Sequence, residues 1–129
     1  MNREIAPSSI AAPAANYALA VQSENVTAWL HTSGIVGVRP DGSIPADIAE
    51  QADVIWASLQ ALLAEAGMIA GDVVSITTYV VADQLEALPQ VMAARDRALQ
   101  GRRVASTLVT VPALARPQWK VEIALIAAR

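Results

Sequence analysis

Two segments of the chain are apolar on both of their alternating faces, and this pattern restricts the folds open to it. The segments "VVSITTYVV" (73–81) and "VEIALIAA" (121–128) are rich in β-branched and aliphatic residues, which predicts strands. A sheet with one wet face has strands that alternate apolar and polar residues. These two strands do not alternate cleanly, so we expect both faces of their sheet to be covered.

Helical spacing of apolar residues appears in the segment "ADIAEQADVIWASLQALLAEAG" (46–67). Its last residue, Gly67, suits the position that follows the end of a helix. Pro89 suits the first turn of a second helix, which we expect to run to about Leu99.

Three short apolar segments complete the expected elements, at 17–22, 28–34 and 104–111. The first two are separated by the turn-like "SENVT" and are interpreted as a strand pair. The resulting order, ββαβαββ, predicts a single α+β domain over residues 1–129, with an antiparallel-rich sheet and two helices on one face. No segment remains to cover the second face. We therefore expect a homo-oligomer whose sheets face inward.

Composition narrows the classes of function. The chain has no cysteine, which excludes disulfides, thiolate catalysis and cysteine metal sites. No apolar run reaches the ~18 residues of a membrane helix, and no signal peptide is evident, so we expect a cytoplasmic protein without membrane contact. A net charge of −3 disfavours nucleic-acid binding. The only basic cluster, Arg102 and Arg103, is better explained as two solvated loop side chains than as a phosphate site.

Residue chemistry alone offers few candidate site residues. Glu122 stands among strand residues that are otherwise predicted to be interior, so it is solvated, paired with a cation, or lines a cavity. His31 is the only histidine and has no second His or Cys to share a metal, which favours a structural or surface role over a site-adjacent one. Ser33 and Gly34 end a predicted strand, where such residues often serve as turn chemistry.

Several segments together resemble the RidA (YjgF) family in order and spacing. They are "PAANYALAV", "HTSGIVG", "GSIPADIAEQ", "QALLAEAGMIAGDVVSITTYV", "VASTLVTVPALA" and "KVEIALIAA", and the resemblance covers about residues 5–128. It implies a chorismate-mutase-like fold and a homotrimer with small clefts between neighbouring subunits. It also implies hydrolysis of enamines and imines, such as 2-aminoacrylate, to a 2-keto acid and ammonia without metal or cofactor.

The resemblance assigns site roles to four residues that match the family pattern. Glu122 aligns with the family's glutamate, which helps to position the attacking water. Tyr17 aligns with its site tyrosine, and Ser33 and Gly34 with the strand end that lines the cleft. On this reading Glu122 lines a polar intersubunit cleft.

Two polar groups of the family pattern are replaced in this chain. Ser106 stands where the deaminating members carry an arginine that forks onto the substrate carboxylate. Met92 stands nearest to the family's asparagine on the second helix. Arg103 lies three residues before Ser106, and in a regular strand that offset aims it at the opposite face unless a bulge intervenes.

The sequence therefore predicts a RidA-like trimer with an altered small-molecule cleft. The expected activity is that of a hydrolase or deaminase for an imine or enamine held without an α-carboxylate grip. The alternative is a non-enzymatic module of the same fold that binds a small ligand or a partner protein. The RNA-cleaving role attached to some relatives is disfavoured by the acidic charge.

Overall fold

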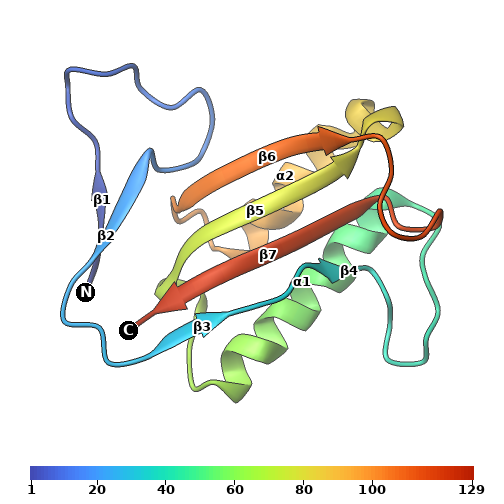
Figure 1. The fold of residues 1–129 in the computed structure, drawn as a ribbon, viewed down its shortest axis with the longest axis horizontal. Coiled ribbons are helices and arrows are strands. Elements are labelled where there is room, and N and C mark those ends of the chain that lie inside the picture. Colours follow the sequence, from blue (N-terminus) through green and yellow to red (C-terminus); the bar gives the residue numbers. More distant parts are fainter.

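The structure, a computed structural model, describes residues 1–129 and contains a mixed five-stranded sheet with two helices behind it (Figure 1). The sheet strands are β3 (Trp29–His31), β4 (Ile35–Val36), β5 (Val73–Val81), β6 (Ala105–Val111) and β7 (Val121–Ala128). Their order is β3-β7-β5-β6, and β4 also pairs with β7. Only β5 and β6 are parallel; the other pairs are antiparallel.

Both expected helices are confirmed. The helix α1 (Ile48–Glu65) begins after Asp47, whose side chain accepts a hydrogen bond from the N–H of Glu50. It ends just before Gly67, whose φ of +68° is the left-handed conformation that glycine adopts readily. The helix α2 (Leu88–Ala98) carries Pro89 in its first turn, where the missing N–H has no partner to lose.

The expected pairing of segments 17–22 and 28–34 is wrong. The first segment overlaps β2 (Ala20–Ser23), which pairs instead with an unpredicted strand, β1 (Asn2–Ile5), in a separate two-stranded sheet. The second segment supplies β3, and β4 follows directly; both pair with β7. The sequence of β1, "NREI", has two charges in four residues, so its strand conformation depends on its partner rather than on its own pattern.

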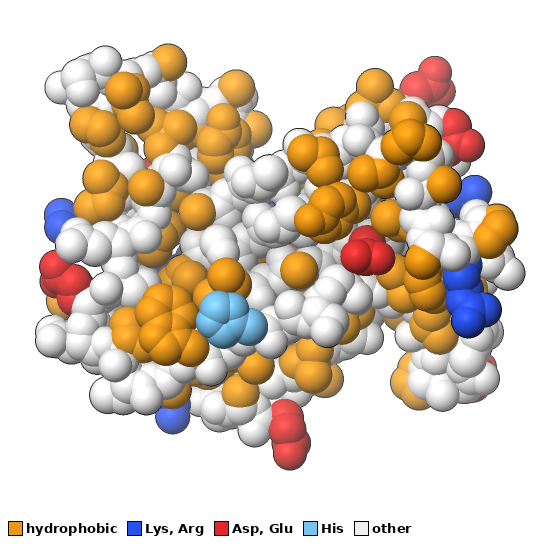
Figure 2. Space-filling model, in the orientation of Figure 1, with side chains coloured by type: hydrophobic (Ala, Val, Ile, Leu, Met, Phe, Trp, Pro, Cys, Tyr) orange, Lys and Arg blue, Asp and Glu red, His pale blue; other side chains and the backbone are white.

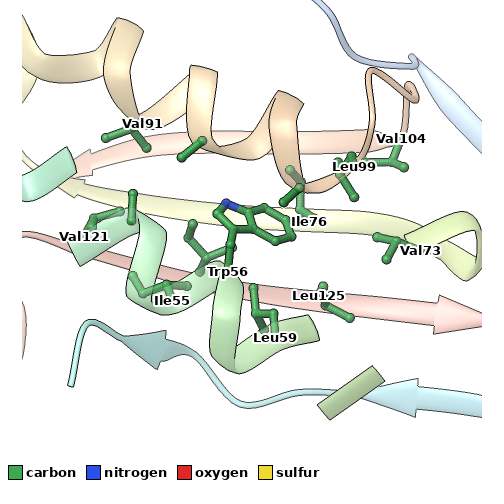
Figure 3. Packing of buried hydrophobic residues seen from close by; sticks show 14 of the residues in the cluster. Ile55, Trp56, Leu59, Val73, Ile76, Val91, Leu99, Val104, Val121 and Leu125 are labelled. Atoms are coloured by element: carbon green, nitrogen blue, oxygen red, sulfur yellow. The ribbon is translucent and has the colours of Figure 1, made fainter. Parts of the chain in front are cut away.

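One layer of apolar side chains joins the helices to the sheet (Figure 3). Trp56 of α1 lies at its centre, with Ile76 of β5 and Val91 of α2 nearby. Along β7 the residues alternate: Val121, Ile123 and Leu125 are buried, whereas the residues between them are only half-buried. The sheet thus has one face covered by helices and one face that this chain leaves uncovered.

Two short 3-10 segments complete the fold. They flank the long central strand, η1 (Ala70–Asp72) before β5 and η2 (Ala82–Ala87) after it. None of the helices is both long enough and apolar enough to cross a lipid bilayer.

The most deeply buried polar side chain is the amide of Gln51 in α1, which has no exposed surface. Its Nε2 donates to the carbonyl oxygens of Pro45 and Gln118, each at 2.8 Å. Its Oε1 accepts from the N–H of Lys120 at 2.9 Å. The amide thus joins α1 to the loop before it and to the segment that enters β7.

Gly37, directly after β4, packs against the same residue. A Cβ at position 37 would lie 2.7 Å from the Cβ of Gln51 and 2.8 Å from its Cα, closer than two carbon atoms can approach. The absence of a side chain at Gly37 therefore lets the end of β4 touch the helix backbone, and β4 and β7 are both held by one turn of α1.

We predict that Gln51→Leu destabilises the protein by about 2–4 kcal/mol, because it leaves two carbonyl groups and one N–H without partners in a largely buried setting. Urea unfolding measures the loss. Gln60→Leu, at an exposed position of the same helix, is the control and should change stability by less than about 0.5 kcal/mol. Equal stabilities for the two variants would contradict the role of the amide.

Candidate functional site

Glu122 lies on the face of the sheet that no helix covers. It follows Val121 and precedes Ile123, both of which point into the core, and its cross-strand partners are Tyr79 of β5 and Val36 of β4. The side chain is half-buried. None of the four ion pairs of the structure involves it, so the ion-pair interpretation has no support within a single chain.

The Glu122 side chain packs directly against Gly34. A Cβ at position 34 would lie 2.7 Å from the Cδ of Glu122 and 2.9 Å from its Cγ, so any side chain there would displace the carboxylate. Two residues that the sequence predicted for the site are therefore in contact. Ser33, the third, is exposed on the same strand end, between β3 and β4.

The uncovered face also carries His31. Its ring is exposed and lies beside the ring of Trp29, with 6.1 Å between the ring centroids (Figure 2). A hollow of about 180 Å³ next to it is lined by residues that include Thr32, Ser75 and Thr77. Thr32 is fixed by its hydroxyl, which accepts a hydrogen bond from the N–H of Leu125 at 3.0 Å. His31 thus stands on an aromatic surface patch rather than in the core.

The remaining predicted residues lie at the other side of the sheet. Ser106 is paired with Ile76, whose side chain is buried beneath the helices, so Ser106 shares the helix-covered face. Met92 is half-buried on α2 and packs against the core. Tyr17 precedes Ala18, whose N–H donates to the carbonyl of Val104 at 2.9 Å, just before β6 begins.

The predicted site is therefore divided between two locations. Glu122 and Gly34 meet on the uncovered face, near the beginning of β7. Tyr17 and Ser106 belong to the opposite edge of the sheet, where β6 begins. Since Glu122 and Ser106 occupy opposite faces of the same sheet, a single chain does not unite them around one ligand.

Sequence reasoning missed one neighbour of Glu122 and one of Arg103. Tyr79 lies directly across from Glu122 on the uncovered face, and the alternation of β5 identifies it only once the strand register is known. Arg103 lies before β6, and its Nη2 is 2.9 Å from a carboxylate oxygen of Glu4. That contact could not be foreseen, because β1 itself was not predicted.

The chain was compared with known proteins by sequence and by structure. A family model described as endoribonuclease L-PSP matches residues 8–129. TdcF of Escherichia coli K12, whose name describes a reactive intermediate deaminase, is 33% identical over 61 residues. That match spans 46% of this chain and 47% of TdcF, so the chain spans about half the length of this curated relative.

Solved structures match over nearly the whole chain. The Rid-family protein YyfB of Yersinia pestis superposes with a TM-score of 0.88 and 28% identity, covering 99% of this chain and 98% of that one. The structure of E. coli TdcF with bound serine has a TM-score of 0.70 and 25% identity, with 98% of each chain covered.

We predict different outcomes for alanine at the two closely packed glycines. Gly34→Ala meets only the flexible side chain of Glu122, so it should cost less than about 1 kcal/mol while moving the carboxylate. Gly37→Ala meets the backbone of Gln51 and should cost about 1–3 kcal/mol. Thermal unfolding compares the stabilities, and a crystal structure of Gly34→Ala locates the carboxylate. An unmoved carboxylate would contradict the contact.

Proposed function

The chain belongs to the endoribonuclease L-PSP family, which includes the Rid proteins, and on this premise we propose that it is a cytoplasmic homotrimer that hydrolyses a small imine or enamine in clefts between its subunits. The observation that carries the proposal is the setting of Glu122. Its carboxylate has no cation partner, is half-buried, and packs against Gly34 on the sheet face without helices. A carboxylate in this position can contact a substrate, because no ion pair within the chain occupies it.

Assembly is supported by the division of the site. Glu122 lies on the uncovered face of the sheet, and Ser106 lies on the helix-covered face at the β6 edge. A ring of three copies brings the first of these from one subunit beside the second from its neighbour, through a heterologous contact that closes on itself. Trp29 on the uncovered face is 56% exposed, and Val109 on β6 is 40% exposed, so both offer apolar surface to such a contact.

In the proposed reaction, Glu122 acts only as an acceptor and donor of protons. A water molecule adds its oxygen to the carbon of the C=N bond, and the carboxylate accepts the proton that this water loses. Glu122 returns this proton to the nitrogen, which gives an amino alcohol. The hydroxyl proton then passes through Glu122 to the nitrogen while the C–N bond breaks, leaving a carbonyl compound and ammonia. Each step needs only a positioned base and a bound substrate, and all its atoms come from the imine and water.

The substrate is a small molecule whose binding does not require an arginine at position 106. The serine bound to E. coli TdcF supports a ligand of about amino-acid size in this family. In this chain the serine hydroxyl of Ser106 and the thioether of Met92 offer no positive charge to a carboxylate. A neutral imine, or one whose carboxylate faces solvent, suits these side chains better than a 2-iminoacid does.

The same arrangement without turnover is the second candidate, a small-molecule binding module. Glu122 then acts as a hydrogen-bond acceptor for the ligand and not as a base. A panel of imines separates the two functions. Release of ammonia above the uncatalysed rate supports hydrolysis, whereas an increase in melting temperature without ammonia release supports binding alone.

We predict that Glu122→Gln abolishes imine hydrolysis but leaves stability within about 1 kcal/mol of wild type, since no ion pair is broken. Breaking a buried pair would cost about 3–5 kcal/mol. Ammonia release, thermal unfolding and light scattering on both proteins make the test. Retained activity in the variant, or a wild type that stays monomeric at micromolar concentration, would refute the proposed site.

We predict that Ser106→Arg increases kcat/KM for a 2-iminoacid by about 10- to 100-fold, because a charged hydrogen bond contributes about 1.5–3 kcal/mol. The neutral imine of similar size is the matched control, and its kcat/KM should not rise. Efficient turnover of 2-iminoacids by the wild type would show that the carboxylate grip is supplied elsewhere.

A further inference from the structure

We propose that the N-terminal hairpin, formed by β1, β2 and the connection between them, contributes to a second binding site. Its ligand is an apolar molecule that bears a carboxylate, and Arg103 binds that carboxylate. The largest cavity of the structure, of about 680 Å³, lies between the connection from β1 to β2 and the residues just before β6. Ligand pockets commonly enclose about 300–1,000 Å³. None of the residues predicted for the intersubunit cleft lines this cavity.

The wall of the cavity is mostly apolar. Ile10, Pro13 and Leu19 contribute to it, and hydrophobic side chains gather over this loop at the upper left of Figure 2. Ile10 is 53% exposed, so its side chain is open to contact with an apolar ligand. An apolar body placed here removes this surface from water, which is the favourable part of binding.

Two charged side chains stand in this apolar wall, Arg103 and Glu4. Their closest atoms are 2.9 Å apart, but no hydrogen bond from the Arg103 guanidinium to any part of the chain accompanies the contact. The adjacent Arg102 differs, because its Nη1 donates to the carbonyl of Ala70 at 2.7 Å. The Nη2 contact with Glu4 leaves the other N–H donors of Arg103, a residue that lines the cavity, without a partner in the chain. A planar carboxylate is the group that satisfies two such donors at once.

Glu4 is the internal competitor for that fork. The Arg103 and Glu4 side chains are 38% and 34% exposed, and ion pairs this open to water are weak. A ligand carboxylate replaces the Glu4 contact while its apolar body adds burial that Glu4 does not supply. A neutral ligand of the same apolar shape cannot make the ionic contact with Arg103, so the site should bind acids more tightly than neutral analogues.

The cavity has one fixed wall and one adaptable wall. Ala18 is held by its hydrogen bond to Val104 and by a bridge to Ala105, so the side toward β6 is anchored. Residues 6–14 make no backbone hydrogen bond to the rest of the chain. Such a segment adjusts to a ligand at low energetic cost, because no hydrogen bonds need to break.

The test uses benzoate and hexanoate as probes, with benzamide and hexanamide as neutral controls of the same shape. Titrations of the full-length protein are followed through the methyl resonances of Ile10 and Leu19. Arg103→Met should weaken binding of both acids by at least about tenfold. Glu4→Gln should strengthen it by up to about fivefold, because the competitor is removed. Arg3→Met is the matched control, since Arg3 contacts Gln22 on the same hairpin and lies outside the cavity.

A misfolded variant would not bind the acids more tightly. The stronger binding expected for Glu4→Gln therefore distinguishes a true effect on the site from loss of binding through misfolding. The proposal is overturned if the amides bind as tightly as the acids, or if Arg103→Met binds normally. It is also overturned if the probes shift only residues near Glu122, or if neither acid binds. These results are independent of imine turnover, so they stand whether or not the chain is a hydrolase.

Discussion

The arrangement of the candidate site depends on the buried amide of Gln51. It is the point where α1, the loop before it and the entry to β7 are joined, and Gly37 brings the end of β4 against the same residue. The carboxylate of Glu122 is carried by β7 and its glycine neighbour precedes β4, so both strands around the carboxylate derive their position from one helical turn. A polar group in the core is costly unless all its hydrogen bonds are made. Here the Gln51 nitrogen donates two hydrogen bonds and its oxygen accepts one, and these three bonds fix the position of the amide.

The long elements of this fold could be predicted because their patterns are local. The β-branched run of β5 and the helical spacing of α1 each specify an element without reference to the rest of the chain. The strand β1 and the partners of β2 and β3 could not be predicted, since short strands are defined by the strand beside them. For the site, the sequence identified Glu122 and Gly34, but their contact required the register of β4 on β7. The opposite placement of Ser106 required the register of β6 on β5.

The uncovered face of the sheet explains why the chain has so much apolar sequence for its size. Most residues of β5 and β7 are buried, and the remaining ones, three in each strand, are partly open to solvent. Such a face exposes apolar area to water in an isolated chain, and contact with other copies of the chain would remove that exposure. The proposed trimer would cover this face and would also complete the proposed cleft.

The contact between Gly34 and Glu122 also couples the two positions. Because the Glu122 side chain occupies the volume where a Cβ would stand, any side chain at position 34 requires the carboxylate arm to move. A shorter acid at 122 would open position 34 to alanine, and a larger residue at 34 would require a smaller one at 122. The two side chains therefore share one volume, and the residue at either position sets the room left at the other.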